Sequence, residues 1–274
     1  MTAKVAFERP RYLCNVPTHY CAGCTHGTAH RLVAEALEHF GVGERAVAVA
    51  PAGCSVMLYK YFDIDSVEAP HGRALAVATG IKRARPDLFV LTYQGDGDLA
   101  SIGLCETMHA ANRGEGVTVI YVNNAVYGMT GGQMAPTTLL GQRTTTTPAG
   151  RSADNEGHPL KMAEMMATLS GVMYSERVAL YDPKQIRRAK KAIFHAFDLQ
   201  IRYNRFAFVE VLSACPTNLK MGAAQSQKWV ENEMCEVFPL GLFKDETANV
   251  PAQPTAEPAA DGNGGNGQET CHAV

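Results

Sequence analysis

The sequence contains no long apolar run and no marked excess of charge of either sign. It carries 25 Lys and Arg against 27 Asp and Glu, so the net charge is -2. Nucleic acids and anionic membranes usually require a basic excess, so bulk charge favours neither partner. No segment approaches the roughly 18 apolar residues of a membrane span. The N-terminal MTAKVAFERPRYLC also lacks the apolar core of a signal peptide. We therefore expect a cytoplasmic protein with no membrane and no nucleic-acid partner.

Two common nucleotide-binding motifs are also missing. No G-x-G-x-x-G follows the first expected strand, and PAGCS (51–55) cannot replace it, so a plain dinucleotide-binding fold is disfavoured. A P-loop is absent as well.

Cysteine, by contrast, is plentiful, with eight in the chain. Disulfide frameworks are rare inside cells, so these residues are either metal or cluster ligands or ordinary buried thiols.

The distribution of apolar residues predicts an α/β fold with a mostly parallel sheet and helices on both of its faces. Apolar positions from Ala29 to Phe40 follow the i, i+3, i+4 spacing of a helix, and Gly41 stands at its C-terminal end. Strands that alternate with helices favour parallel crossover connections. The other helices are expected at 72–85, 100–114, 160–171 and 183–203, and the strands at 46–50, 88–93, 117–122, 175–180 and 205–213.

We expect one domain, residues 1–245, with a long polar loop at 144–159 rather than two domains. The segment 246–274 is rich in proline and glycine and has almost no large apolar side chain. Such composition predicts a disordered tail, in which Cys271 and His272 form an inert pair.

The stretch YQGDGDLASIG (93–103) places carboxylates directly after an apolar strand, where packing gains nothing from them. Open parallel sheets bind their ligands at the carboxyl ends of the strands. Asp96 lies there, and Asn124 and the backbone carbonyl of Val126 follow the next strand. Three hard oxygens at one point suit Mg²⁺, which fills its other positions with phosphate oxygens and water.

The glycines of this stretch have a separate use. Gly95 and Gly97 would let the backbone approach a diphosphate closely, and a helix starting near Leu99 would direct free N–H groups at it. A lone Gly-Asp-Gly is more often an ordinary β-turn. Its pairing with an asparagine at the next strand end favours the functional interpretation.

Four cysteines stand at positions that suit ligation. Cys21-x-x-Cys24 is a local pair, whereas Cys54 and Cys215 end two distant expected strands. By count, four such thiolates suit zinc and a [4Fe-4S] cluster equally, although zinc sites usually draw two close pairs. The remaining cysteines of the expected domain are interpreted as core thiols: Cys14, Cys105 and Cys235.

Taken together, these motifs resemble a known family. The Gly-Asp-Gly turn and the later Asn-Asn pair are similar to the thiamine diphosphate signature. The chain looks like the thiamine-binding β subunit of 2-oxoacid:ferredoxin oxidoreductases of the 2-oxoglutarate or 2-oxoisovalerate type. The similar segments, in order across about residues 12–222, are CAGCTHGTAHRL, PAGCS, EAPHGRALAVATG, GDGDLASIG and NNAVYGMTGGQMAPTT. The resemblance implies the diphosphate-binding fold of thiamine enzymes.

The resemblance also implies three cofactors, which are thiamine diphosphate, Mg²⁺ and one [4Fe-4S] cluster. The implied Mg²⁺ ligands are Asp96, Asn124 and the carbonyl of Val126. The implied cluster ligands are Cys21, Cys24, Cys54 and Cys215. The residues implied at thiamine diphosphate are Gly53, Ser55, His71, Gly95, Asp96, Gly97, Asp98, Asn124, Gly128, Met129 and Thr130. No residue of this chain is assigned as certainly catalytic, because the activating glutamate of thiamine enzymes is expected from a partner.

The implied activity is the coenzyme A-dependent oxidative decarboxylation of a 2-oxoacid to acyl-CoA and CO₂, with electrons passing through the cluster to ferredoxin. The implied partners are an α subunit with the pyrimidine module, a γ subunit and a ferredoxin-like δ subunit. The resemblance does not distinguish 2-oxoglutarate from a branched-chain oxoacid as the substrate. An apolar pocket wall formed by Met57 and Met129 would suit the branched-chain oxoacid. Two alternatives remain: a non-redox thiamine decarboxylase or ligase subunit with structural zinc, and a cluster-carrying electron-transfer subunit with a degenerate thiamine site.

Overall fold

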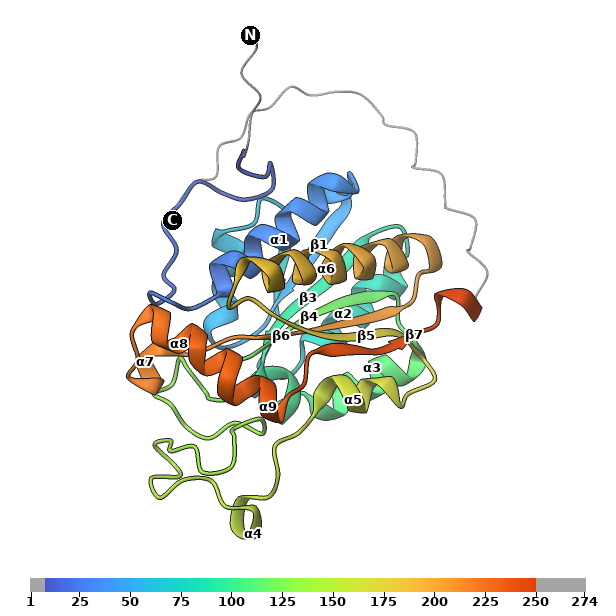
Figure 1. Ribbon diagram of the computed structural model, residues 1–274. Coiled ribbons are helices and arrows are strands. Elements are labelled where there is room, and N and C mark those ends of the chain that lie inside the picture. The colour runs from blue at the N-terminus through green and yellow to red at the C-terminus, as the bar shows by residue number, and fades with distance from the viewer. Residues whose placement is uncertain (1–7, 250–274) are drawn as a thin grey trace.

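The computed structural model describes residues 8–249, which form a seven-stranded sheet (Figure 1). The strand order is β2-β1-β3-β4-β6-β5-β7. Neighbouring strands run parallel except for β7, which is antiparallel to β5. The strands are β1 Ala46–Ala50, β2 Asp65–Glu68, β3 Phe89–Gly95, β4 Val117–Asn123, β5 Val172–Ala179, β6 Phe206–Leu212 and β7 Gly241–Asp245.

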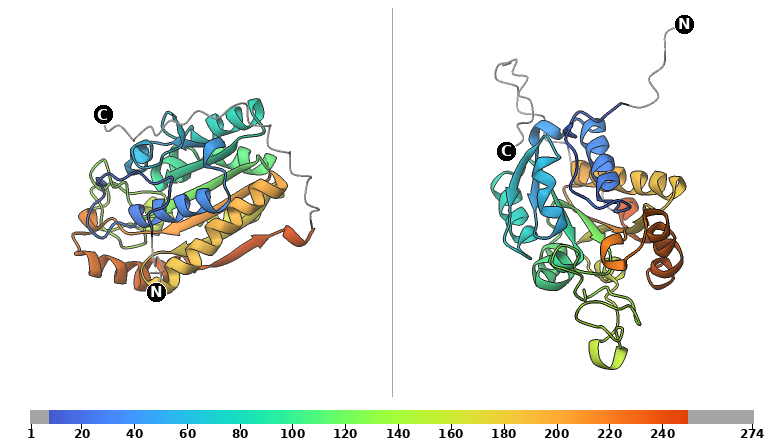
Figure 2. Two further views of the ribbon diagram at one scale, coloured as in Figure 1. Left: turned by 90° about the horizontal axis from the view of Figure 1, so that it is seen from above. Right: turned by 90° about the vertical axis from the view of Figure 1, so that its left-hand side faces the viewer.

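Helices cover both faces of the sheet. On one face, α1 (His26–His39) and α6 (Pro183–Tyr203) pack side by side, as Figure 2 shows from above. On the other face lie α2 (Ala74–Ala84), α3 (Leu104–Arg113) and α5 (Met162–Ala167). The shorter helices are α4 Ala153–Glu156, α7 Pro216–Leu219, α8 Ala223–Trp229 and α9 Cys235–Val237. The short helical turns are η1 Gly43–Arg45, η2 Cys54–Lys60, η3 Gly97–Ile102, η4 Val230–Met234 and η5 Thr247–Asn249.

Helix α6 shows how the sequence produces this packing. Asp182 caps its first turn by accepting a hydrogen bond from the N–H of Gln185, and Pro183 occupies a position where no N–H is needed. Its buried Phe197 packs on Phe89 of β3 with ring centroids 4.6 Å apart. Burial of each such ring contributes about 1.5–3 kcal/mol. The apolar stripe of α6 therefore fixes the helix to the centre of the sheet.

The predicted fold class is confirmed, and several elements have the predicted bounds. The strand expected at 46–50 is β1, and the helix expected at 183–203 is α6. The helix expected at 100–114 is interrupted, because a π-helical turn at Gly97–Ile102 precedes α3. Two strands were not predicted, and both lie at sheet edges: β2, with the mostly exposed sequence DSVE, and β7. Edge strands need no continuous apolar pattern, so their sequences carry little signal.

A long irregular segment connects β4 to α5 and projects beyond the carboxyl edge of the sheet, with α4 along it (Figure 1). This segment begins at residue 124 and includes the loop predicted at 144–159. It is organised around Arg151, which is 5% exposed. The Arg151 guanidinium donates to the backbone carbonyls of Ala135, Pro136, Thr138, Glu156, Gly157 and His158. One side chain therefore closes the segment on itself beside the strand ends.

Within residues 8–249, no helix is both long and apolar enough to cross a membrane. Residues 250–274 lie outside the described part of the chain, together with Cys271 and His272. The domain boundary after residue 245 and the disordered tail stay predictions.

Candidate functional site

The carboxyl ends of β3 and β4 bring together the three residues expected to hold Mg²⁺. These strands are parallel neighbours, so the residues that follow them meet at one edge of the sheet. Asp96 is 4% exposed there. Its carboxylate accepts hydrogen bonds from the backbone N–H groups of Gly97 (2.9 Å), Val126 (3.2 Å) and Asn124 (3.3 Å). The turn after β4 is thus built around the Asp96 carboxylate.

Three oxygens converge at this point. The side-chain oxygen of Asn124 lies 2.6 Å from the carbonyl oxygen of Val126 and 3.1 Å from Oδ2 of Asp96. Oxygens with no proton between them repel, so the site requires either a rotated Asn124 amide that donates to both or a cation among them. Burial also raises the pKa of Asp96 to about 7, and every donor to its carboxylate is neutral. A divalent cation would bind the hard oxygens and stabilise the carboxylate charge, so the donor set fits Mg²⁺.

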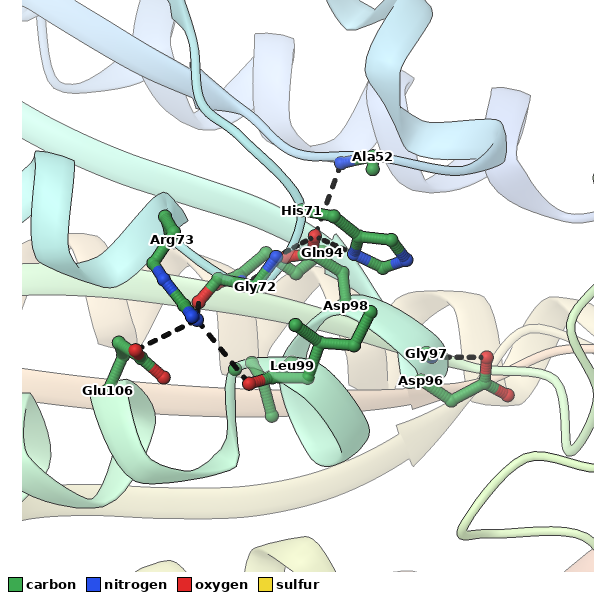
Figure 3. A network of polar contacts seen from close by, with 12 residues as sticks. Ala52, His71, Gly72, Arg73, Gln94, Asp96, Gly97, Asp98, Leu99 and Glu106 are labelled. Atoms are coloured by element: carbon green, nitrogen blue, oxygen red, sulfur yellow. Dashed lines mark hydrogen bonds and ion pairs between the residues drawn. The ribbon is translucent and has the colours of Figure 1, made fainter.

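Asp98 joins three segments behind this site, as Figure 3 shows. Its Oδ1 accepts hydrogen bonds from Nδ1 of His71 (2.8 Å) and from the N–H groups of Gly72 (2.8 Å) and Ala52 (3.2 Å). Its Oδ2 accepts one from the Gln94 amide (2.6 Å). The carboxylate oxygens of Asp98 accept from every one of these partners, so Nδ1 of His71 is the ring nitrogen that faces Asp98. The buried Asp98 therefore orients His71, whose side chain is 43% exposed.

Glycines and Ser55 shape the neighbouring backbone. Gly53 has a φ of 84°, a left-handed conformation that other residues rarely adopt. It lies directly before η2, which contains the buried Ser55. The Ser55 hydroxyl would lie 3.9 Å from a β-carbon at Gly95, so both line the same space. A β-carbon at Gly97 would lie 2.9 Å from the ring of Tyr127, which leaves no room for a side chain.

Gly128 connects the Asp96 site to the cysteines. A β-carbon there would lie 3.3 Å from Sγ of Cys215 and 3.7 Å from Sγ of Cys54. Two of the candidate ligand sulfurs therefore flank the loop that carries Val126. The next residues, Met129 and Thr130, are exposed on the same loop.

The four candidate cluster cysteines come from separate segments. Cys21 and Cys24 precede α1, Cys54 begins η2 after β1, and Cys215 precedes α7 after β6. Burial raises the pKa of Cys24 to about 12, and charge on the other three thiols adds to this effect. Burial, with charge on Cys215 and Cys21, raises the pKa of Cys54 to about 11. Charge on the neighbouring thiols thus disfavours the ionisation of Cys24 and Cys54, and a bound cationic centre would relieve this. Within residues 8–249, no three His, Cys, Asp or Glu residues are grouped to hold a single metal ion.

Two donors to sulfur were not predicted from the sequence. The Thr217 hydroxyl donates to Sγ of Cys21 (3.1 Å), and the Asn218 amide donates to Sγ of Cys215 (3.0 Å) and to the carbonyl of Gly128 (3.1 Å). Both donors lie in the turn after Cys215. The polar residues that follow this cysteine in the sequence CPTN were therefore the local pattern that could have indicated hydrogen bonds to sulfur.

Two residues that support the carboxylates were also missed. The Thr137 hydroxyl lies 3.4 Å from Oδ2 of Asp96, and Gln94 donates to Asp98. Thr137 falls within the motif that ends in APTT, and Gln94 precedes Gly95 directly. Neither position could be distinguished from its polar neighbours by sequence alone.

The other cysteines differ from the expectation of buried core thiols. Cys105 is exposed on α3, and Cys235 is half-buried. The expectation for Cys105 was wrong because its position on the outer side of α3 faces away from the sheet. Cys14 is half-buried.

Comparisons with known proteins agree with this geometry. Residues 51–211 match the family described as thiamine pyrophosphate enzyme, C-terminal TPP binding domain. The chain is 53% identical over 244 residues to the ketoisovalerate oxidoreductase subunit VorA of Methanothermobacter thermautotrophicus, covering 89% of this chain and 51% of the relative. It is 37% identical over 241 residues to the 2-oxoglutarate synthase subunit KorB of Archaeoglobus fulgidus, covering 84% of this chain and 86% of the relative. This chain therefore spans about half the length of VorA but most of KorB.

A solved structure is similar over nearly the whole chain. It is a 2-oxoglutarate:ferredoxin oxidoreductase from Magnetococcus marinus with 2-oxoglutarate, coenzyme A and succinyl-CoA bound. The TM-score is 0.72 at 27% identity, with 92% of this chain and 88% of that chain covered.

Proposed function

The chain belongs to the thiamine pyrophosphate enzymes, and on that premise we propose that it is the thiamine-binding subunit of a 2-oxoacid:ferredoxin oxidoreductase. One observation carries the proposal. The side chain of Asn124 lies close to both the Val126 carbonyl and Asp96, and the same loop continues directly to Gly128, which lies close to the sulfurs of Cys54 and Cys215. A site for a metal-bound diphosphate therefore adjoins a set of thiols that can hold an electron acceptor.

We assign the Mg²⁺ ligands to Asp96, Asn124 and the carbonyl of Val126. Bound thiamine diphosphate supplies a nucleophilic carbon for 2-oxoacid decarboxylation. The other residues of this chain would position the cofactor. Asp98 fixes His71, and the buried Asp96 carboxylate supplies the single negative charge among neutral donors. The residues proposed to surround the diphosphate are Gly53, Ser55, His71, Gly95, Gly97, Asp98, Gly128, Met129 and Thr130.

We assign a [4Fe-4S] cluster to Cys21, Cys24, Cys54 and Cys215. Charge on the neighbouring thiols helps to raise the pKa values of Cys24 and Cys54, and hydroxyl and amide groups donate to the sulfurs of Cys21 and Cys215, which together support a shared cationic centre. Such free thiols persist in a reducing compartment, which supports a cytoplasmic location. The alternative is structural zinc in a non-redox enzyme. Iron and sulfide analysis with the visible spectrum of anaerobically purified protein separates the two, because a zinc protein has no visible absorption.

We propose a branched-chain 2-oxoacid as the substrate. Identity to the ketoisovalerate enzyme (53%) exceeds that to the 2-oxoglutarate enzyme (37%). Met57 lies on η2, two residues after Ser55, and Met129 follows Gly128, so both flank the proposed cofactor site with flexible apolar surface. Comparing kcat/KM for 2-oxoisovalerate and 2-oxoglutarate tests this. A preference for 2-oxoglutarate would reject the assignment.

We propose that the active site is completed by a partner α subunit with the pyrimidine module and its activating glutamate, and that γ and ferredoxin-like δ subunits complete the assembly. VorA is about twice as long as the stretch it shares with this chain, which supports a need for further protein segments. Burying a cofactor between chains predicts a large, mainly apolar interface of the obligate kind. Coenzyme A would bind on the partner, and ferredoxin would accept the electrons.

The decisive experiment uses the full-length chain purified anaerobically and reconstituted with iron, sulfide, Mg²⁺ and thiamine diphosphate. Binding of thiamine diphosphate should depend on Mg²⁺, and oxoacid- and coenzyme A-dependent reduction of a viologen dye should appear when the partner subunits are added. A chain that binds neither thiamine diphosphate nor iron would contradict the proposed function.

A further inference from the structure

Asn123, the last residue of β4, is fully buried directly beside the proposed Mg²⁺ ligand Asn124. Its amide oxygen accepts the N–H of Ala125 at 3.1 Å, and its amide nitrogen donates to Oε1 of Glu210 at 2.8 Å. Glu210 lies on the neighbouring strand β6 and is also fully buried. Both polar ends of the Asn123 side chain are therefore satisfied inside the sheet.

The residue that Asn123 holds has an unusual backbone. Ala125 has a φ of 60°, in the left-handed region. An L-residue with a β-carbon is disfavoured about tenfold or more in this region. The Ala125 carbonyl is held as well, by the hydroxyl of Thr138 at 2.7 Å and the amide of Gln142 at 3.2 Å. Ala125 is thus fixed on both sides, between the side chain of Asn124 and the carbonyl of Val126.

Glu210 is itself anchored. Its Oε2 accepts hydrogen bonds from Nε of Arg177 at 2.9 Å and from the N–H of Ala163 at 3.1 Å. Arg177 is fully buried, pairs with Glu164, and lies over the ring of Phe238 at 5.3 Å. Because every group in this chain of contacts has its partners, Asn123 has one stable orientation.

We propose that Asn123 is a positioning residue for the proposed Mg²⁺ site, and that Glu210 and Arg177 fix its orientation. By accepting the Ala125 N–H, Asn123 maintains the left-handed turn that directs the Asn124 oxygen and the Val126 carbonyl toward Asp96. This role rests on the proposed function, because the turn positions ligands only if a cation binds there.

The first test needs no metal. Hydrogen–deuterium exchange is measured on peptides covering residues 124–133 of the full-length chain without metal or cofactor. Asn123→Ala should accelerate exchange in these peptides about tenfold, since the turn loses its acceptor.

The chain supplies a matched control on the same strand. Gln200 accepts from Thr118 of β4 at 2.6 Å and donates to the carbonyl of Gly116 at 2.9 Å, at the opposite end of β4. Gln200→Ala likewise removes two buried hydrogen bonds, but it should leave exchange at 124–133 unchanged. Equal acceleration by both variants would show a general loss of stability and overturn the inference.

The second test measures binding of Mn²⁺, as a probe of the Mg²⁺ site, by electron paramagnetic resonance at fixed thiamine diphosphate. Asn123→Ala should weaken binding about tenfold, and Gln200→Ala should not. A wild-type chain that binds no Mn²⁺ would overturn the proposed function together with this role. Wild-type binding that Asn123→Ala retains in full would overturn the inference alone.

A charge-swapped pair keeps the test decisive if Asn123→Ala does not fold. Asn123→Asp alone places two carboxylates together and should weaken binding. Adding Glu210→Gln restores every hydrogen bond, because the glutamine amide donates to Asp and its oxygen still accepts from Arg177. The double variant should recover Mn²⁺ affinity to within about twofold of wild type, and failure to recover while the fold is intact would contradict the proposed mechanism.

Discussion

Replacing Asp96 with asparagine should have opposite effects on the metal-free fold and on cofactor binding. Burial raises the pKa of Asp96 from its ordinary 3.8 to about 7. An acid with a higher pKa in the folded state binds its proton more tightly there. Ionised Asp96 therefore destabilises the metal-free fold, and this loss of stability develops as the pH rises from about 4 to about 7.

The size of this loss of stability follows from the change in the pKa of Asp96. Each pKa unit corresponds to about 1.36 kcal/mol, so ionisation of Asp96 costs the metal-free fold up to about 4 kcal/mol at pH 8. Asparagine does not ionise, but it offers one acceptor oxygen fewer to the surrounding N–H groups, which costs about 1–3 kcal/mol. We expect Asp96→Asn to raise the free energy of unfolding by about 1–3 kcal/mol at pH 8. The advantage should disappear toward pH 4.

In the presence of metal, the wild-type protein should instead be stabilised more than Asp96→Asn. Wild-type protein at ligand concentrations near 100 times Kd gains about 2.7 kcal/mol from Mg²⁺ and thiamine diphosphate. Asp96→Asn should gain almost nothing, because the only charged oxygen has been removed. Protons compete for the wild-type carboxylate, so its apparent affinity for Mg²⁺ should fall about tenfold for each pH unit below about 7.

The assay is urea unfolding followed by circular dichroism under anaerobic conditions at pH 5 and pH 8, with chelator or with Mg²⁺ and thiamine diphosphate. Asp98→Asn is the matched control, since the Asp98 carboxylate faces four donors of its own and its loss should destabilise the fold by about 1–3 kcal/mol at pH 8. An Asp96→Asn chain that is less stable than wild type at pH 8 without metal, or equally stabilised by Mg²⁺, would refute this reasoning.

Three further outcomes are expected. Cys215→Ser should destabilise the cluster or leave a three-iron form, whereas Cys105→Ser and Cys235→Ser should keep full iron content. Equal loss of iron in all three variants would remove the support for Cys215 as the fourth cluster ligand. Asn218→Ala removes a hydrogen bond to the Cys215 sulfur, so it should lower the reduction potential of the cluster, measured by redox titration. An unchanged reduction potential would argue against cluster ligation at Cys215. The reconstituted chain alone should not sustain viologen reduction with an oxoacid, and turnover near that of the assembled complex would rule out an active site shared with a partner.

Local patterns in the sequence were sufficient for much of the fold and for the candidate ligands. Strand β1 was predictable because a short continuous apolar run is typical of a strand that is buried on both faces. Helix α6 was predictable because its apolar residues recur with the period of a helix. Asp96 and Asn124 were predictable because a short motif places each at a strand end. Each motif is a short local pattern, and its pairing with the other motif, 28 positions away, supports the functional interpretation. Neither step requires knowledge of distant contacts.

The edges of the sheet and the supports of the site were decided by tertiary structure. Strand β7 exists because β5 offers it unpaired backbone groups, and its own sequence does not require this. Asn123 and Glu210 are 87 positions apart, and Arg177 and Glu210 are 33 apart, so no local pattern relates them. They meet because β4, β6 and β5 are neighbours in the sheet. The sequence by itself thus determined which atoms can bind the cofactors, whereas the orientation of those atoms depends on buried hydrogen bonds that form only when distant strands pair.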